Sequence, residues 1–94
     1  MHGKVVLITG GAKRVGAAIA RLLHAAGANL MIHYRSSADE ARALQDELNA
    51  LREDSVALIQ ADLLETAILP SLVSQTVTIF GGLDVLVNNA SSFF

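Results

Sequence analysis

Residues 9 to 16 read Thr9-Gly10-Gly11-Ala12-Lys13-Arg14-Val15-Gly16, directly after the apolar run Val5-Val6-Leu7-Ile8. The apolar residues that follow recur with helical spacing. A strand, a glycine-bearing turn and a helix form a phosphate site, because N–H groups at a helix start donate to anions and the helix dipole favours negative charge. Gly10 and Gly11 permit the sharp turn without a side chain over the phosphate, and Gly16 permits close packing of the helix on the strand.

The composition fits one small domain of parallel α/β type. Of the 94 residues 52% are hydrophobic and only 4% aromatic, so aliphatic side chains and alanine must build the core. A net charge of −2 gives no general attraction for nucleic acid or an anionic membrane.

The absence of cysteine excludes disulfides, thiolate zinc sites and thiol catalysis, and His2, His24 and His33 lack the spacing of a metal site. No apolar run reaches the about 18 residues of a membrane helix, and no signal-peptide core precedes the first strand, so we expect a cytoplasmic protein.

Strand and helix patterns alternate along the whole chain. Strands are predicted over Lys4–Thr9, Asn29–Tyr34, Ser55–Gln60 and Leu83–Asn88, and helices over Arg14–Ala26, Ala38–Leu51 and Ile68–Phe80. Right-handed crossovers then give an α/β fold, a Rossmann-type doubly wound parallel sheet in the order 3-2-1-4. We interpret residues 1–94 as the N-terminal dinucleotide-binding portion of a single such domain.

The helical period also predicts which side chains face the sheet. The inward residues are predicted to be Val15, Ile19, Leu22, Leu23 and Ala26 in the first helix, Ala41, Leu44, Leu48 and Leu51 in the second, and Leu69, Leu72, Val73, Thr76, Val77 and Phe80 in the third. The opposite face of the second helix is charged, which favours a solvated face over a binding surface. His24 lies within the first helix, where we interpret it as a structural or surface residue rather than a base.

The predicted ligand site lies between the first and fourth strands. In sheets of this order, ligands bind at the carboxyl ends of the strands, where the strand order reverses. The glycine turn, defined here as residues 10–13, ends there, and so does the segment Asn88-Asn89-Ala90-Ser91. Two segments that are distant in the sequence are therefore predicted to form one site.

The segment after the second predicted strand favours NADP over NAD. An NAD-binding domain usually has a carboxylate about 20 residues past the glycine turn, which accepts from the ribose 2′-hydroxyl. This chain has His33-Tyr34-Arg35-Ser36-Ser37 instead, and the first acid is Asp39. Arg35 can bind a 2′-phosphate bidentately while a serine hydroxyl donates, and Lys13 and Arg14 add positive charge. The alternative is a surface loop in which Arg35 is merely solvated.

Two interpretations of Asp62-Leu63, after the third strand, stay open. Asp62 could accept from the adenine amino group while Leu63 covers the ring. It could equally stand at a helix N-terminus, where the dipole stabilises its charge.

Together these segments resemble the short-chain dehydrogenase/reductase superfamily over the whole chain. The matching motifs are Thr9-Gly10-x-x-x-Arg14-x-Gly16, Asp62-Leu63 and Leu86-Val87-Asn88-Asn89-Ala90. Arg14 and Ser91 stand where most members have glycine. These two residues, with His33-Tyr34-Arg35-Ser36 and Asn89-Ala90-Ser91-Ser92-Phe93, are similar to pteridine reductases, which are NADPH-dependent enzymes that reduce biopterin- or folate-type rings.

The resemblance implies contacts to NADP(H) and to a pterin or folate-type substrate. The implied cofactor residues are Gly10, Lys13, Arg14, Val15, Gly16, His33, Tyr34, Arg35, Ser36, Asp62, Leu63, Asn89, Ala90 and Ser91. Arg14 would approach both the diphosphate and the pterin, Ser91 would hydrogen-bond either of them, and Phe93 would stack on the pterin ring. The alternatives are that Ser91 is a polar turn residue and that Phe93, like Phe94, extends the core into a further segment.

No residue of this chain is assigned a catalytic role. The resemblance implies a tyrosine as proton donor with a lysine four residues later, but the only tyrosine is Tyr34 and residue 38 is alanine. The fourth predicted strand is an apolar, uncovered edge, which invites pairing with other chains. We therefore expect the rest of the enzyme to follow Phe94 and the intact protein to form a homo-oligomer, as the tetrameric relatives do. The isolated 94-residue segment is expected to be inactive and to aggregate or fold only in part.

Two other functions share these sequence features. An NADPH-dependent carbonyl or 3-oxoacyl reductase of the same superfamily would have the same cofactor half and would differ at Arg14, Ser91 and Phe93. A non-catalytic nucleotide-binding module would lack a Tyr-x-x-x-Lys motif beyond Phe94, which the gene sequence would reveal.

Overall fold

The structure, a computed structural model, describes residues 1–62 and 68–89. The strands are β1 (Val5–Thr9), β2 (Asn29–Tyr34), β3 (Val56–Gln60) and β4 (Val85–Asn88), and the helices are α1 (Arg14–Ala25), α2 (Ala38–Leu51) and α3 (Ile68–Phe80). Each element begins and ends within two residues of its predicted bounds. Gly27 follows α1 with a φ of 101°, the left-handed conformation that glycine adopts most easily after a helix.

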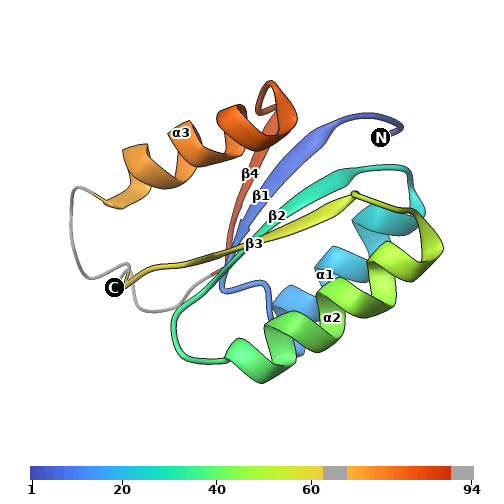
Figure 1. The fold of residues 1–94 in the computed structure, drawn as a ribbon, viewed down its shortest axis with the longest axis horizontal. Coiled ribbons are helices and arrows are strands. Elements are labelled where there is room, and N and C mark those ends of the chain that lie inside the picture. Colours follow the sequence, from blue (N-terminus) through green and yellow to red (C-terminus); the bar gives the residue numbers. More distant parts are fainter. Residues whose placement is uncertain (63–67, 90–94) are drawn as a thin grey trace.

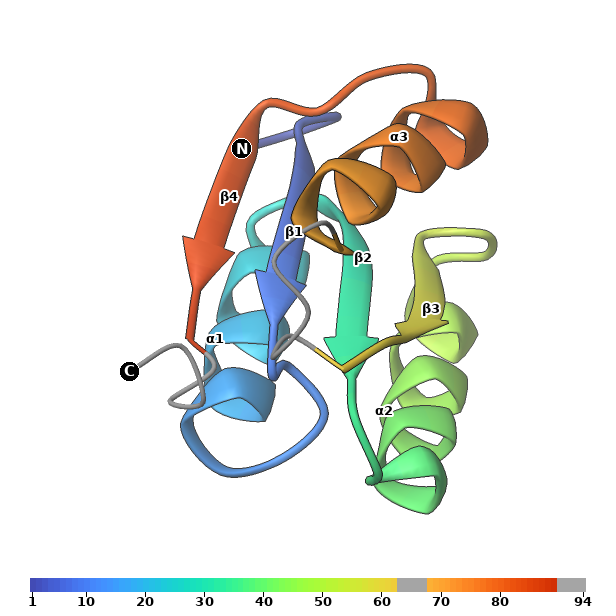
Figure 2. The ribbon, with the colours of Figure 1, turned by 90° about the vertical axis from the view of Figure 1, so that its left-hand side faces the viewer.

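The sheet has the predicted order β3-β2-β1-β4, and all of its strands are parallel. Helices α1 and α2 cover one face of the sheet and α3 lies on the other (Figure 1). The carboxyl ends of all strands point the same way, toward the edge where the glycine turn joins β1 to α1 (Figure 2). This edge is the one at which a parallel sheet of this type binds its ligands.

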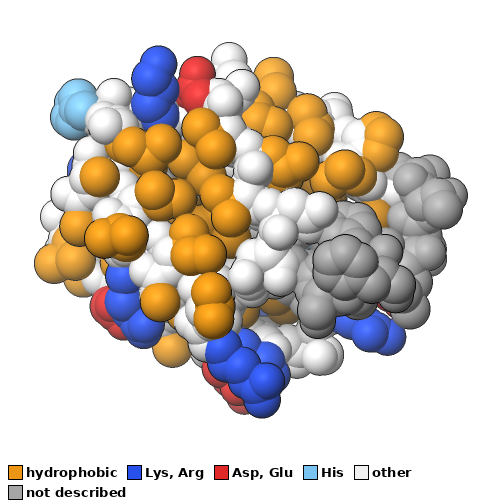
Figure 3. All heavy atoms as spheres, turned by 180° about the vertical axis from the view of Figure 1, so that it is seen from behind, with side chains coloured by type: hydrophobic (Ala, Val, Ile, Leu, Met, Phe, Trp, Pro, Cys, Tyr) orange, Lys and Arg blue, Asp and Glu red, His pale blue; other side chains and the backbone are white. Residues whose placement is uncertain are grey.

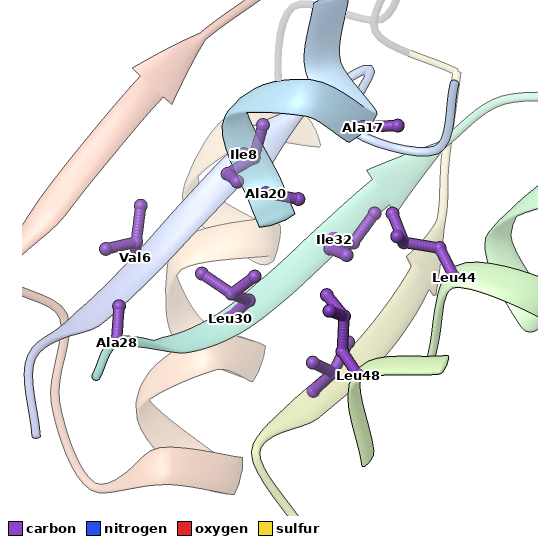
Figure 4. Close-up of a cluster of buried hydrophobic side chains, with 10 residues drawn as sticks. Val6, Ile8, Ala17, Ala20, Ala28, Leu30, Ile32, Leu44 and Leu48 are labelled. Carbon is purple, nitrogen blue, oxygen red and sulfur yellow. The ribbon is translucent and has the colours of Figure 1, made fainter. Parts of the chain in front are cut away.

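The two faces of the sheet bury two separate apolar clusters. Alternate side chains of β1 and β2 point to opposite faces, so Ile8 pairs with Ile32 toward α1 and α2, while Leu7 pairs with Met31 toward α3. The cluster under α1 and α2 is drawn in Figure 4, where Leu44 and Leu48 of α2 reach toward β2. Every residue of β1 is buried, which places this strand at the centre of the domain.

The predicted inward face of α1 is only partly right: Ile19 and Leu23 pack against the core, whereas Val15, Leu22 and Ala26 do not. The side chains that face the sheet are Gly16, Ala17, Ala20 and His24, and these are buried. Val15 and Leu22 are instead 64% and 72% exposed, Ile19 and Leu23 are half-buried, and Ala26 is exposed. The physical reason is that α1 lies close to the sheet at Gly16, Ala17 and Ala20, where only small side chains fit beneath it (Figure 4); farther along the helix there is room for the ring of His24. The large aliphatic residues therefore flank the contact or point away from it.

The other helix faces are predicted more accurately. In α2, Ala41, Leu44 and Leu48 are buried as expected, but Leu51, its last residue, is 75% exposed. In α3, Leu72 and Thr76 are buried and the other predicted residues are half-buried, except Val77, which is 43% exposed. Successive residues of a helix point about 100° apart around its axis. Because Thr76 lies in the middle of the buried face of α3, Val77 lies at the edge of that face.

Strand β4 forms one edge of the described sheet. None of its residues is buried, and Leu86 is 42% exposed. Hydrophobic side chains spread over the face of the molecule seen in Figure 3. This exposed apolar edge contrasts with β1, its fully buried neighbour. Among the residues with described structure, no helix is long and apolar enough to cross a membrane.

Candidate functional site

The glycine turn is held against the end of β2 by two backbone hydrogen bonds. Gly10 N–H donates to the His33 ring nitrogen Nδ1 at 3.0 Å, and Gly11 N–H donates to the His33 carbonyl oxygen at 3.0 Å. Gly10 has a φ of 63°, a conformation that favours glycine. Since the first two N–H groups of the turn are used in this way, the donors that remain for an anion belong to the start of α1.

Neighbouring atoms leave no room for a side chain at Gly16 and little room for one at Gly11. A Cβ on Gly11 would lie 3.0 Å from Cγ2 of Ile8. A Cβ on Gly16 would lie 2.2 Å from the carbonyl oxygen of Gly10 and 2.7 Å from Nδ2 of Asn89. The close packing expected at Gly16 is therefore present, and it brings the first turn of α1 directly against the glycine turn.

The N-terminus of α1 has the features of an anion site. The capping residue Lys13 makes no side-chain hydrogen bond to the helix, and the first turn contains no acidic residue. The first N–H groups of a helix lack partners within it, so they can donate to a bound anion. Arg14, the first helical residue, has a φ of 56°, which is left-handed and unfavourable for any residue with a Cβ.

The end of β4 meets the glycine turn, as predicted. Asn89 Nδ2 donates to the carbonyl oxygen of Gly10 at 3.0 Å, and Asn89 N–H donates to Thr9 Oγ1 at 3.0 Å. Thr9 is buried and also lies 3.2 Å from Oδ1 of Asn88. This contact of Thr9 with the end of β4 was not predicted, although a threonine that ends an otherwise aliphatic strand is a signal for such a contact.

These segments enclose a cavity of about 370 Å³ at the carboxyl ends of the strands. Its lining comprises Gly10, Ala12, Lys13, Arg14, Val15, His33, Tyr34, Arg35, Ser36, Ser37 and Asn89. Three of these side chains are cationic and none is a carboxylate. In a chain with a net charge of −2, this concentration of positive charge makes the cavity suited to an anionic ligand.

Arg35 lies near the carboxylate of Asp62, with its Nε 3.8 Å from Oδ1. The Arg35 and Asp62 side chains are 57% and 42% exposed, so the pair is solvated and contributes little to stability. The backbone beside them is fixed more firmly, because Gln60 Nε2 donates to the carbonyl oxygen of Arg35 at 2.8 Å. Arg35 is therefore held at the mouth of the cavity without being buried.

His33 differs from the other lining residues because its ring is only 2% exposed and both ring nitrogens face backbone groups. Nδ1 accepts from Gly10 N–H, and Nε2 lies 2.8 Å from the carbonyl oxygen of Ala61. Burial lowers the pKa of His33, and the hydrogen bond to Ala61 opposes this in part. His33 was predicted to contact the cofactor. In the structure, its ring instead links the glycine turn to the end of β3 through these two hydrogen bonds.

Other predicted site residues fall into two groups. Tyr34, Val15 and Ser36 line the cavity, as does Ser37, the alternative serine donor to a 2′-phosphate; Ala12 also lines it and was not predicted. Leu63, Ala90, Ser91 and Phe93 lie outside the described residues.

His24 is structural, as expected. It is 2% exposed and its Nε2 lies 2.7 Å from Ser55 Oγ. Burial, together with the nearby charge of Arg52, lowers its pKa. Within residues 1–62 and 68–89, no group of three or more His, Cys, Asp or Glu side chains could hold a metal ion.

Comparison with known proteins agrees with this geometry. The family model for short chain dehydrogenase matches residues 4–92. The chain is 42% identical to pteridine reductase 1 of Leishmania tarentolae, over 96% of this chain and 37% of that protein. It is 40% identical to hydroxynaphthalene reductase of Aspergillus fumigatus, over 96% of this chain and 33% of that protein. It is 36% identical to D-beta-hydroxybutyrate dehydrogenase of Rhizobium meliloti, over 97% of this chain and 35% of that protein.

The chain thus spans about a third of the length of these curated relatives. The family match covers nearly all of its own residues, including the glycine turn and the end of β4. The chain therefore belongs to the short chain dehydrogenase family.

Proposed function

We propose that the cavity binds NADPH and that the whole protein is an NADPH-dependent oxidoreductase. The diphosphate would lie at the N-terminus of α1, between the helix N–H groups and the cations Lys13 and Arg14. The uncapped helix start and the absence of acid in its first turn support this placement. The spacing at Gly16 supports it as well, because a side chain there would displace the turn.

The choice of NADPH over NADH is carried by one observation: the cavity lining beyond β2 contains Arg35, Ser36 and Ser37 and no carboxylate. A 2′-phosphate would accept from the guanidinium and the hydroxyls, and a carboxylate at this place would repel it. The hydrogen bond from Gln60 Nε2 to the carbonyl oxygen of Arg35 supports the same assignment, since it fixes the backbone of Arg35 at the mouth of the cavity. We also propose that the Asp62 carboxylate accepts from the adenine amino group.

For the substrate we propose a pteridine of the dihydrobiopterin or dihydrofolate type. The support is the identity of 42% to a pteridine reductase and the position of Arg14 in the lining of the cavity. Ser91 and Phe93 are proposed to complete the pterin contacts. When bound, NADPH supplies a hydride, and the protein must orient the two rings and supply a proton.

We assign no proton donor for that reaction to residues 1–94. Tyr34, its only tyrosine, lines the cavity on the side of Arg35 and is followed four residues later by Ala38. We therefore propose that the donor belongs to a part of the protein outside these 94 residues. A homo-oligomeric state and a cytoplasmic location remain predictions, and light scattering of the full-length gene product would measure the first.

Calorimetric titration of the full-length gene product with NADPH and with NADH tests the cofactor proposal. We expect tighter binding of NADPH, and we expect Arg35→Asp to weaken NADPH much more than NADH because it places like charge beside the 2′-phosphate. Equal losses for both dinucleotides would contradict the role of Arg35.

Turnover on dihydropteridines and on 3-oxoacyl substrates tests the second part of the proposal. Faster reduction of the pteridine is expected. A preference for the keto substrate would instead support a carbonyl reductase that shares the same cofactor half.

A further inference from the structure

We propose that His33 is a positioning residue whose neutral imidazole holds the glycine turn in its binding geometry, so that protonation of this ring weakens dinucleotide binding in acid. This inference rests on the proposed function, since it concerns the same cavity. It assigns to His33 a role different from direct contact with the cofactor, and it makes the affinity of the site depend on pH through one side chain.

The ring of His33 joins three strand ends. It projects from β2, accepts from Gly10 N–H beyond β1 at 3.0 Å, and faces the carbonyl oxygen of Ala61 beyond β3 at 2.8 Å. At 2% exposure it cannot exchange either partner for water without opening the site. Gly10 in turn accepts from Asn89 Nδ2, which connects the ring indirectly to β4.

The two hydrogen bonds require one protonation state. Because Gly10 N–H is a donor, Nδ1 must carry a lone pair, and because the carbonyl of Ala61 is an acceptor, Nε2 must carry the proton. A protonated imidazole has N–H groups on both nitrogens. The Nδ1–H group of His33 and the backbone N–H of Gly10 would then face each other as two donors. The hydrogen bond between them must break, and the N–H of Gly10 loses its acceptor.

The surrounding charges oppose a further positive charge. Lys13, Arg14 and Arg35 line the same cavity as His33, while the carboxylate of Asp62, beyond β3, pairs with Arg35. Helix α3, which packs on the same face of the sheet, has no ionisable side chain between its first and last residues. Burial lowers the pKa of His33, so the ring is neutral at neutral pH.

The direction of the pH effect follows from this lowered pKa. The hydrogen bond to Gly10 is fully present above about pH 6.5, the ordinary pKa of histidine, and it is lost as the pH falls through the lower pKa of the folded protein. Since the glycine turn leads directly into the N-terminus of α1, release of Gly10 moves the donors proposed to hold the diphosphate.

Two substitutions separate the two hydrogen bonds. The side-chain oxygen of asparagine lies close to where Nδ1 of histidine lies, so His33→Asn keeps an acceptor for Gly10 and cannot titrate. The side-chain nitrogen of glutamine lies close to where Nε2 lies, so His33→Gln keeps a donor for Ala61 but offers Gly10 no acceptor. His24→Asn is the matched control, because His24 is equally buried and has a lowered pKa but lies outside the cavity.

The experiment is calorimetric titration of the full-length gene product and these variants with NADP⁺, which is stable in acid, at about pH 7.5 and in steps down to the pH at which the wild type begins to unfold. Near neutrality we expect His33→Asn to bind within a few fold of the wild type and His33→Gln to bind about tenfold more weakly, the effect of one lost hydrogen bond. In acid the wild type is expected to lose affinity relative to His33→Asn, while His24→Asn follows the wild type. Protonation of the 2′-phosphate of NADP⁺ affects the wild type and all variants equally, so its effect cancels in the ratios of their affinities.

A constant ratio between the wild type and His33→Asn over this whole pH range would overturn the inference, as would equal affinities of the Asn and Gln variants. Failure of the wild type to bind NADP⁺ at any of these pH values would instead refute the proposed function. If a variant does not fold, a pH titration of the wild type followed by nitrogen NMR of the His33 ring replaces the measurement on that variant. The Gly10 amide signal is then expected to titrate together with the His33 ring, and a Gly10 signal that does not change as His33 takes up its proton overturns the inference.

Discussion

Arg14 has a left-handed backbone conformation, with a φ of 56°, at the first residue of α1 and in the lining of the cavity. Any side chain with a Cβ pays about 1–2 kcal/mol for this conformation, and only glycine adopts it freely. Backbone strain of this kind persists where the residue has a function that outweighs its cost. We therefore predict opposite effects on stability and on binding when Arg14 is replaced by glycine.

The comparison that isolates the strain is between Arg14→Gly and Arg14→Ala. Both remove the guanidinium, but only glycine relieves the conformation. The left-handed conformation costs Arg14→Ala about 1–2 kcal/mol, whereas Arg14→Gly loses about 0.5–1 kcal/mol more in chain entropy on folding. The difference leaves Arg14→Gly more stable than Arg14→Ala by about 1 kcal/mol. In an ordinary helix the order is reversed, with alanine more stable than glycine by about 1 kcal/mol.

Urea denaturation of the full-length gene product measures this difference, and calorimetry with NADPH measures the loss of binding. Both variants are expected to bind NADPH about tenfold more weakly, because one charge-assisted hydrogen bond to the diphosphate is lost. Asp54 provides a matched control, since it has a φ of 57° in the exposed turn before β3. Asp54→Gly and Asp54→Ala should show the same order of stability without any change in NADPH affinity.

A greater stability of Arg14→Ala than of Arg14→Gly would refute the left-handed conformation of Arg14. Wild-type affinity for NADPH in both variants would refute its place beside the diphosphate. The two results are independent, so the strain and the function of this residue can be separated.

The other predictions concern packing, pH and the isolated segment. Gly16→Ala should destabilise the protein by about 3 kcal/mol, measured by urea denaturation, because the added Cβ would overlap the carbonyl oxygen of Gly10; a loss well below 1 kcal/mol would contradict this packing. The lowered pKa of His24 means that the unfolded chain binds more protons below about pH 6.5, so stability should fall as the pH drops. This slope should shrink in His24→Gln, and an unchanged slope would exclude His24 as a source of it. The isolated 94-residue segment should sediment as aggregates through its apolar β4 edge, whereas a cooperative, monomeric melt would contradict that expectation.

The sequence predicted the order of the strands because alternating strands and helices with right-handed connections leave few arrangements. The hydrophobic period of α1 predicted the contact of Ile19 and Leu23 with the core, but it was wrong for Val15 and Leu22, which are exposed. The burial of Gly16, Ala17 and Ala20 follows from the close approach of the helix to the sheet, which no periodicity of large side chains encodes.

The candidate site was predicted in outline but not in its internal contacts. The convergence of Asn89 on the glycine turn followed from the topology, and the cations of the cavity could be read directly from the sequence. The hydrogen bonds of the His33 ring depend on how three strand ends are placed in space. A pattern along one chain carries no information about that placement, so His33 was assigned to the cofactor instead of to the turn.

The most direct test is a crystal structure of the full-length gene product grown with saturating NADPH. We predict that the diphosphate lies at the N-terminus of α1 and that the 2′-phosphate lies within hydrogen-bonding distance of Arg35. A cavity that holds no dinucleotide under these conditions, or that is filled by the protein's own side chains, would contradict the account.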